Sequence, residues 1–225
     1  MIDIVITGSN GLIGESLSSY FTKNKLNVAN LDLELGHDLE NERFVKDWFA
    51  ENPAKSLINA FAINDHVNSI REENNFLYTP LENFKRVMDV NLTALFSVCR
   101  QFIFNNKSGS IVNFSSIYGA VSPDPNLYGG NEKDIAYGIS KAGVIQLSRH
   151  LAVHSAPNFR VNSIVLGGIK HQQNPDFISS YSNKVPLRRM GNLSEISGLV
   201  EYLISEKSSY CTGAMFTLDG GWTAV

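Results

Sequence analysis

The stretch "ITGSNGLIG", residues 6–14, decides the fold that the sequence predicts. It places Gly8, Gly11 and Gly14 between an apolar, strand-like run and the amphipathic pattern of a helix. Glycines allow a sharp turn without Cβ atoms, and the free N–H groups at the start of the following helix attract phosphate. This arrangement is typical of a turn that holds the pyrophosphate of a dinucleotide. A glycine-rich turn can also be a plain connection, so the assignment depends on neighbouring features.

Strand-like and helix-like segments alternate along the whole chain. Apolar runs indicate strands at 2–7, 26–32, 55–61, 109–115, 160–166 and 214–219. Helical periodicity appears at 12–23, 42–50, 81–105, 137–154 and 194–204. The strand runs are continuous, as expected when both faces of a sheet are covered. The order predicts an α/β fold, a Rossmann-like doubly wound parallel sheet in three layers, formed by one domain over residues 1–225.

The second predicted strand ends at Asp32, and the next predicted helix begins at Glu42. A parallel crossover needs about a dozen residues or more. We therefore expect the crossover helix and the strand after it to be stunted at this point.

Asp32 also indicates which dinucleotide is bound. A carboxylate at the end of the second strand can accept both hydroxyls of the adenosine ribose, and it repels a 2'-phosphate. No Lys or Arg stands at positions 9, 10, 33 or 34 to neutralise such a phosphate. The sequence therefore predicts NAD(H) in preference to NADP(H), although Asp32 could instead be a solvated residue at a strand end.

Composition and charge narrow the classes of partner. The chain has 225 residues, 43% of them hydrophobic, and a formal net charge of −3, with Lys and Arg scattered along it. This distribution argues against nucleic acid and anionic membrane surfaces as partners. We find no run of eighteen apolar residues, no basic leader and no metal-ligand spacing of His or Cys, so we expect a soluble cytoplasmic protein without a metal.

The segment "YGISK" places Tyr137 and Lys141 four residues apart, on one face of a predicted helix. A packed tyrosine beside a solvated lysine would give the same pattern. Two upstream residues favour chemistry instead. Ser116 ends a predicted strand, at the edge of the sheet where ligands bind, and Asn91 lies inside a predicted helix although asparagine is a poor helix former.

Together, the glycine turn, Asn91, Ser116, Tyr137 and Lys141 resemble the short-chain dehydrogenase/reductase family, and the resemblance runs from residue 2 to residue 222. It implies that Tyr137 is the general acid/base and that Lys141 lowers the pKa of Tyr137 and holds the nicotinamide ribose. It also implies that Ser116 donates a hydrogen bond to the substrate oxygen and that Asn91 holds a water molecule of a proton relay. The cofactor contacts expected from the motifs and the resemblance are Gly8, Asn10, Gly11, Leu12, Ile13, Gly14, Asp32, Asp38, Leu39, Asn59, Ala60, Tyr137, Lys141, Gly167 and Ile169. Asp38 remains open between an adenine contact and a helix N-cap.

The predicted reaction is the NAD(H)-dependent interconversion of a secondary alcohol and a ketone. The long approach to Tyr137, an insertion over 119–136, resembles bacterial oxidoreductases of surface-glycan and flagellin-sugar biosynthesis, such as those of the legionaminic acid route. A sugar, sugar phosphate or sugar nucleotide is therefore the expected substrate, with Tyr118, Tyr128 and His66 as candidate contacts. The insertion itself is interpreted as a substrate lid.

Two other functions stay open: a sugar-nucleotide epimerase or dehydratase that recycles its NAD, and a dinucleotide-binding regulatory protein without turnover. The helices at 81–105 and 137–154 resemble the dimer faces of the family, which implies a homodimer or homotetramer. Arg188 and Arg189 could grip a phosphate or fix their own loop.

Overall fold

The computed structural model describes residues 1–64, 76–128 and 132–225. Six parallel strands form one sheet in the order β2-β1-β3-β4-β5-β6. The strands are β1 (Ile2–Thr7), β2 (Val28–Leu31), β3 (Ala54–Asn59), β4 (Gly109–Ser116), β5 (Phe159–Leu166) and β6 (Met215–Leu218). The chain goes from β1 to β2 on one side and then places β3 on the other side of β1. The strand order therefore reverses between β1 and β3, where a sheet of this kind opens a crevice for a ligand.

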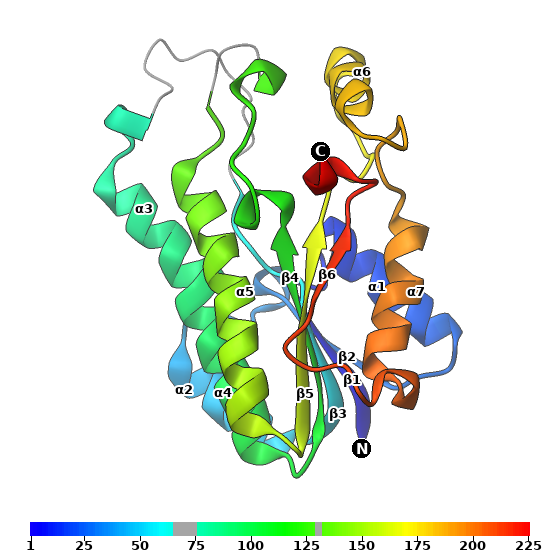
Figure 1. The fold of residues 1–225 in the computed structure, drawn as a ribbon. Helices are drawn as coiled ribbons and strands as arrows, with labels where there is room; N and C mark the ends of the chain where they lie inside the picture. The colour runs from blue at the N-terminus through cyan, green and yellow to red at the C-terminus, as the bar shows by residue number, and fades with distance from the viewer. Residues whose placement is uncertain (65–75, 129–131) are drawn as a thin grey trace.

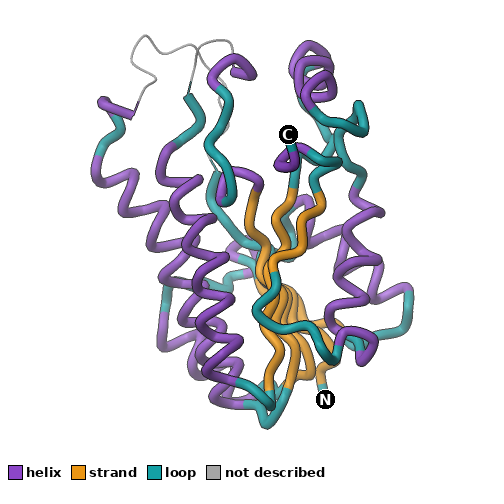
Figure 2. Tube along the Cα trace, in the orientation of Figure 1, coloured by secondary structure: helices purple, strands orange, loops and turns teal. Residues whose placement is uncertain are grey.

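Helices cover both faces of the sheet, as Figures 1 and 2 show. They are α1 (Leu12–Lys23), α2 (Glu42–Glu51), α3 (Leu81–Met88), α4 (Leu95–Asn105), α5 (Ile135–Ser155), α6 (Pro175–Lys184) and α7 (Leu193–Ile204). Buried side chains of α2, α4 and α5 share one apolar cluster with the sheet, and those of α1 and α7 share another. The predicted single-domain, three-layer α/β fold is confirmed.

Alternation along the strands builds these two clusters. In β1, Val5 belongs to the cluster under α2, α4 and α5, whereas Ile4 and Ile6 belong to the cluster under α1 and α7. Successive side chains of a strand point to opposite faces, so an uninterrupted apolar run fills both layers of the core.

The short crossover after β2 is as stunted as predicted. Residues 32–41 contain one turn of 3-10 helix, Leu33–Leu35, and the chain then enters α2. β2 is consequently the edge strand of the sheet.

Two features differ from the sequence prediction. The helix expected over 81–105 is interrupted by a π-helical segment, Asp89–Ala94, that separates α3 from α4. The helix α6 was not predicted; its large apolar side chains are Phe177, Ile178 and Tyr181. Both features lie beside the candidate site described below.

The segment Leu81–Asn105 has the length and hydropathy of a membrane-crossing helix, by composition alone. Its Val98, Cys99 and Phe102 are fully buried in the cluster between helices and sheet. A core helix of this kind satisfies the same criterion, so the segment is explained by its packing.

Candidate active site

The glycine turn admits only glycine at two of its positions. Gly8 has φ +71°, and a Cβ on it would lie 2.5 Å from the backbone nitrogen of Phe61. A Cβ on Gly14 would lie 2.0 Å from the carbonyl oxygen of Gly8. The start of α1 therefore sits directly against the end of β1, as a turn that brings backbone N–H groups close to a ligand requires.

The same turn has polar groups that a phosphate would satisfy. Gly11, the N-cap of α1, has no side chain to accept the N–H groups of the first helical turn, which includes the predicted contacts Leu12 and Ile13. The Ser9 hydroxyl is buried, and among the described residues it has no hydrogen-bond partner. Orphaned donors at a helix N-terminus fit the pyrophosphate of a dinucleotide.

Asp32 lies beside this turn at the end of β2. Its two carboxylate oxygens accept hydrogen bonds from the backbone nitrogens of Asn10, at 2.9 Å, and Glu34, at 3.0 Å. The Asn10 side chain in turn donates to the Glu34 carboxylate, at 3.1 Å. These bonds hold Asp32 in place, and an ionised carboxylate keeps further acceptor positions for ribose hydroxyls. Asp32 and Glu34 together give the crevice a negative charge.

Asp38 does not cap a helix. Its carboxylate accepts from the Glu40 nitrogen, at 3.0 Å, whereas the N-cap of α2 is Asn41, whose side chain accepts from Phe44. The capping alternative for Asp38 is therefore wrong, and the adenine contact stays a prediction. Its neighbour Leu39 is buried in the core.

Asn59 has a structural role that the sequence prediction missed. Its amide accepts from the Thr7 hydroxyl, at 2.8 Å, and donates to Asn113, at 2.8 Å, and to the Cys99 sulfur, at 3.4 Å. These bonds join β1, β3, β4 and α4 inside the core. A cofactor contact by this side chain would require breaking them. The next residue, Ala60, donates its backbone N–H to the carbonyl oxygen of Thr7, at 3.0 Å, and so lies beside the start of the glycine turn.

Ser116, Tyr137 and Lys141 converge above the carboxyl end of β4. Ser116 is the last residue of that strand, and its hydroxyl interacts with the Tyr137 side chain. Lys141, one turn further along α5, places its ammonium 5.8 Å from the centre of the Tyr137 ring. The neighbouring Ser115 donates to the Lys141 carbonyl oxygen, at 2.7 Å. Ser115 thus joins β4 to α5, and Ser116 is the serine of this pair that meets the tyrosine.

The ionisation of this group differs from the expectation in one respect. Burial raises the pKa of Tyr137, while its bond with Ser116 acts in the opposite direction. Burial also lowers the pKa of Lys141 to about 8, and the Lys141 ammonium donates to the Phe114 carbonyl, at 2.9 Å. Lys141 by itself therefore does not bring the Tyr137 pKa below its ordinary value, because desolvation of the phenolate is the larger effect.

Asn91 lies in the π-helical segment and is almost fully buried. Its amide accepts from the Ile63 nitrogen, at 2.8 Å, and donates to the Ile63 carbonyl, at 3.0 Å, and to the Ser140 hydroxyl, at 3.1 Å. Ser140 donates to the carbonyl of Tyr137, at 2.8 Å. Asn91 thus joins the segment after β3 to the helix that carries the tyrosine, and π-helical segments are frequent at functional sites.

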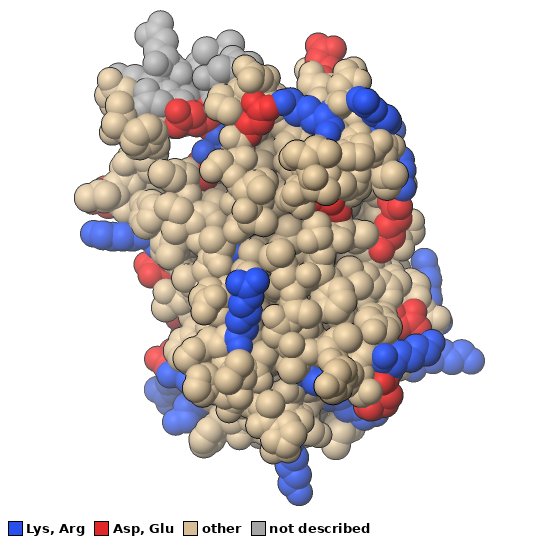
Figure 3. Space-filling view, viewed as in Figure 1, with Lys and Arg blue, Asp and Glu red and all other residues tan. Residues whose placement is uncertain are grey.

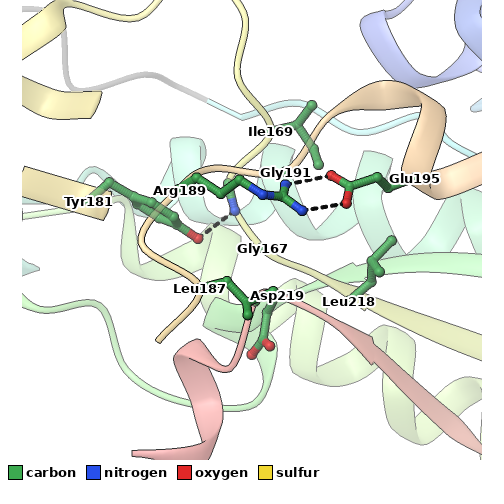
Figure 4. A pocket seen from close by; sticks show the side chains of 11 residues that line it. Gly167, Ile169, Tyr181, Leu187, Arg189, Gly191, Glu195, Leu218 and Asp219 are labelled. Atoms are coloured by element: carbon green, nitrogen blue, oxygen red, sulfur yellow. Dashed lines mark hydrogen bonds and ion pairs between the residues drawn. The ribbon is translucent and has the colours of Figure 1, made fainter. Parts of the chain in front are cut away.

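Gly167 and Ile169 line a hollow beyond the end of β5, together with Tyr181, Arg189, Glu195 and Asp219 (Figure 4). A Cβ on Gly167 would lie 2.8 Å from the Asp219 Cα. Ser116, Tyr137 and Lys141 are not among the lining residues.

Arg189 forms an ion pair with Glu195 through two hydrogen bonds, both at 2.7 Å (Figure 4). Of the two roles considered for Arg189, gripping a phosphate or fixing its own loop, this contact matches the second, because it joins the loop to α7.

The insertion before Tyr137 packs against α6. The Tyr118 and Tyr128 hydroxyls lie 2.5 Å apart, and the Tyr128 ring lies 5.8 Å from that of Phe177 on α6. An ion pair between Asp124 and Lys184 joins the same two segments. Burial raises the pKa of both Tyr118 and Tyr128, so both phenols are neutral hydrogen-bonding groups. His66 lies outside the described residues.

Lys133 is a residue of this site that the sequence analysis did not identify. It is buried, with 8% of its surface exposed, and its ammonium lies 5.2 Å from the centre of the Tyr137 ring. The signal in the sequence is a lysine four residues before the tyrosine, which mirrors Lys141 four residues after it.

Comparison with known proteins places the chain in a family. Residues 22–223 match a family model described as "Enoyl-(Acyl carrier protein) reductase". D-arabinitol 2-dehydrogenase (ribulose-forming) of Candida albicans is 30% identical over 97% of this chain and 92% of its own length. Among solved structures, a short chain dehydrogenase from Leptospira borgpetersenii with bound NAD+ is 32% identical, with a TM-score of 0.87 over 99% of this chain and 94% of that one. The 4-hydroxyisoleucine dehydrogenase complexed with NADH is 29% identical, with a TM-score of 0.85 over 99% of both chains.

The chain belongs to the short-chain dehydrogenase/reductase family. It is an oxidoreductase of the class that acts on CH–OH groups with a nicotinamide dinucleotide, as its sequence predicted.

Proposed function

We propose that this enzyme interconverts a secondary alcohol and a ketone with NAD(H), and that Tyr137 is its general acid/base. The observation that carries the proposal is the convergence of Ser116, Tyr137 and Lys141 at one edge of the sheet, beside a glycine turn whose free N–H groups suit a pyrophosphate. The bound nicotinamide supplies hydride acceptance and donation.

The protein's own groups would handle the proton. In the oxidation direction, the Ser116 hydroxyl donates a hydrogen bond to the substrate oxygen, and the phenolate of Tyr137 takes the hydroxyl proton as hydride leaves the same carbon. In the reduction direction, the phenol of Tyr137 returns that proton to the oxygen. Lys141, whose pKa is lowered to about 8 by burial, is a cation at neutral pH and stabilises the phenolate.

Replacing the tyrosine tests this assignment directly. Tyr137→Phe should abolish NAD-linked turnover and leave NADH affinity within a few-fold of the parent, because the ring is kept and only the hydroxyl is lost. Lys107→Met, at an exposed position before β4, is the matched control. Turnover retained in Tyr137→Phe would end the assignment.

We propose that the cofactor is NAD(H) rather than NADP(H). Asp32 and Glu34 both contact Asn10 of the glycine turn, and beside a bound adenosine ribose their charges would oppose a 2'-phosphate. Titration with NADH and NADPH, followed by cofactor fluorescence, should show tighter binding of NADH. The double variant Asp32→Ser/Leu33→Arg should reverse the preference. Tighter binding of NADPH to the parent protein would contradict the proposal.

We propose a polar, sugar-derived substrate held between the insertion and α6. The paired hydroxyls of Tyr118 and Tyr128 suit a hydroxylated ligand, and a relative named for oxidising D-arabinitol supports a sugar or polyol. The narrower resemblance to surface-glycan oxidoreductases stays a prediction. A screen of polyols, sugar phosphates and sugar nucleotides by NADH absorbance would identify the class. Stoichiometric NADH release separates a dehydrogenase from an epimerase that recycles its cofactor.

We also propose a homo-oligomer built on α4 and α5. Both helices expose large apolar side chains, including Phe104 and Val153, which are 82% and 73% exposed. On the face shown in Figure 3, Lys and Arg are interspersed with Asp and Glu, without a single-sign patch that would suit nucleic acid. Sedimentation of the parent and of Phe104→Glu should show dissociation in the variant.

A further inference from the structure

Two lysines, rather than one, hold their ammonium groups against the Tyr137 ring. Lys133 lies four residues before the tyrosine and Lys141 four residues after it, and their ammonium nitrogens are 5.2 and 5.8 Å from the ring centre. Both side chains are buried. A lysine is rarely buried without a strong reason, and an ammonium near an aromatic ring is attracted to the negative face of that ring.

The start of α5 puts Lys133 in this place. The helix begins at Ile135, and Asp134 is its N-cap in an extended conformation. The Asp134 carboxylate accepts from the Ala136 nitrogen, at 2.9 Å. Lys133 directly precedes this cap, and its ammonium lies 5.2 Å from the centre of the Tyr137 ring in the first turn of the helix.

Lys141 alone does not offset the cost of burying the Tyr137 phenolate, so a second cation nearby would stabilise that phenolate further. Burial raises the pKa of the tyrosine, and Lys141, with a pKa of about 8, loses its charge as the pH rises above that value. Among the described residues, the other titratable side chains around the tyrosine are the phenols of Tyr118 on the turn after β4 and Tyr128 on the insertion, which stay neutral at these pH values because burial raises their pKa.

On α5 itself, the Asp134 carboxylate is committed to the cap and to the Asn83 amide of α3, at 3.4 Å. An ammonium at about 5 Å from an ionising group stabilises its anion substantially in a partly buried site.

We propose that Lys133 is a second cation of the active site, whose charge lies close to Tyr137 and offsets part of the cost of burying its phenolate. The inference rests on the proposed role of Tyr137 as general acid/base. Lys133 makes the phenolate of Tyr137 easier to form, and its effect is added to that of Lys141. Removing its charge should raise the apparent pKa of Tyr137 by about 1 to 2 pH units, from Coulomb's law over about 5 Å at an effective dielectric of roughly 20 to 40.

Titration of the phenolate by near-ultraviolet difference absorbance tests the inference without a known substrate. The NAD+-loaded parent minus the NAD+-loaded Tyr137→Phe variant isolates this one tyrosine. The same difference is then recorded in the backgrounds Lys133→Met, Lys133→Arg and Lys107→Met. We expect an upward displacement of about 1 to 2 pH units for Lys133→Met, little change for Lys133→Arg, which keeps the charge, and none for Lys107→Met, which changes an exposed lysine.

The outcomes separate this inference from the proposed function. If the parent difference shows an acidic phenol that Lys133→Met does not move, Lys133 has no such role and the function of Tyr137 stands. If the parent difference shows no phenol more acidic than an ordinary tyrosine, the acid/base assignment itself fails, and the inference fails with it.

Once a substrate is in hand, the pH profile of kcat/KM gives a second readout. Its acidic limb should rise in pH by the same amount in Lys133→Met and be restored in Lys133→Arg. A raised KM with an unmoved profile would make Lys133 a substrate contact and overturn the inference. If Lys133→Met does not fold, Lys133→Gln replaces it in both measurements.

Discussion

Replacing Asn91 with alanine should destabilise the protein and misplace the tyrosine helix at the same time. The amide of Asn91 makes three hydrogen bonds, two to the backbone of Ile63 and one to Ser140, and the residue is only 2% exposed. Each bond contributes about 1 kcal/mol net, and a buried backbone group left without a partner costs about 1 to 3 kcal/mol. A loss of about 3 to 4 kcal/mol is therefore expected for Asn91→Ala, within the upper range for a point mutation.

Urea unfolding followed by circular dichroism, with linear extrapolation of the free energy of unfolding, measures this loss. Ser140→Ala should cost about 1 kcal/mol, and the double variant should cost less than the sum of the two, because they share one hydrogen bond. Asn24→Ala is the matched control: this asparagine is exposed and bonds only to its own helix, at Tyr20, so its replacement should cost less than about 0.5 kcal/mol.

The result that would refute the reasoning is a stable Asn91→Ala protein. A loss below about 1 kcal/mol, the net contribution of a single bond, would show that the bonds to Ile63 and Ser140 are not what Asn91 contributes. If such a stable variant also lost turnover, Asn91 would act in the chemistry, as the water-holder of the proton relay expected from the family resemblance.

Three further predictions concern the glycine turn and two charged groups. Gly14→Ala places a Cβ 2.0 Å from the Gly8 carbonyl oxygen, so the backbone of the glycine turn must shift. NADH affinity measured by calorimetry should therefore fall at least about tenfold, which corresponds to roughly 1.4 kcal/mol of binding free energy. Unchanged affinity would contradict the role of the glycine turn in binding the dinucleotide. Arg189 lowers the pKa of Glu195 to about 2, so the ion pair stabilises the fold above the ordinary carboxyl pKa and its contribution is lost as the pH falls toward 2. The difference in free energy of unfolding between the parent and Glu195→Gln should therefore be small at neutral pH, because the pair is exposed, and should vanish in acid. The pKa of Lys141 is lowered to about 8, so the unfolded chain binds more protons than the folded one between that pH and the ordinary lysine pKa. The free energy of unfolding should therefore rise with pH across this window in the parent but not in Lys141→Met. Equal slopes of the free energy of unfolding against pH would contradict the burial of a charged lysine.

The site residues that sequence analysis placed correctly are those whose positions depend on strand and helix patterns close by in the chain. Gly8 follows β1 directly, Gly14 lies in the first turn of α1, and Ser116 ends β4, so their place at the carboxyl edge of a parallel sheet follows from the strand and helix pattern. Tyr137 and Lys141 are one helical turn apart, and the helix needs only 3.6-residue periodicity to bring them together.

Other roles depend on partners far away in the sequence. Asn59 was expected at the cofactor, but its amide is held by Thr7, Asn113 and Cys99 from three other elements. The helix α6 has few apolar residues, and the residues it packs against, such as Tyr128 beside Phe177, lie far away in the sequence.

The sequence by itself determined the layers of the fold, the glycine turn and the pairing of Tyr137 with Lys141 on one helix, because each depends on spacing within a few residues or on continuous apolar runs. Only the tertiary structure decided how acidic that tyrosine can be. The balance depends on desolvation and on Ser116 from the end of β4, and we propose that the two ammonium groups near the ring contribute as well. Burial and distance between side chains set these effects, and neither quantity can be read along the chain.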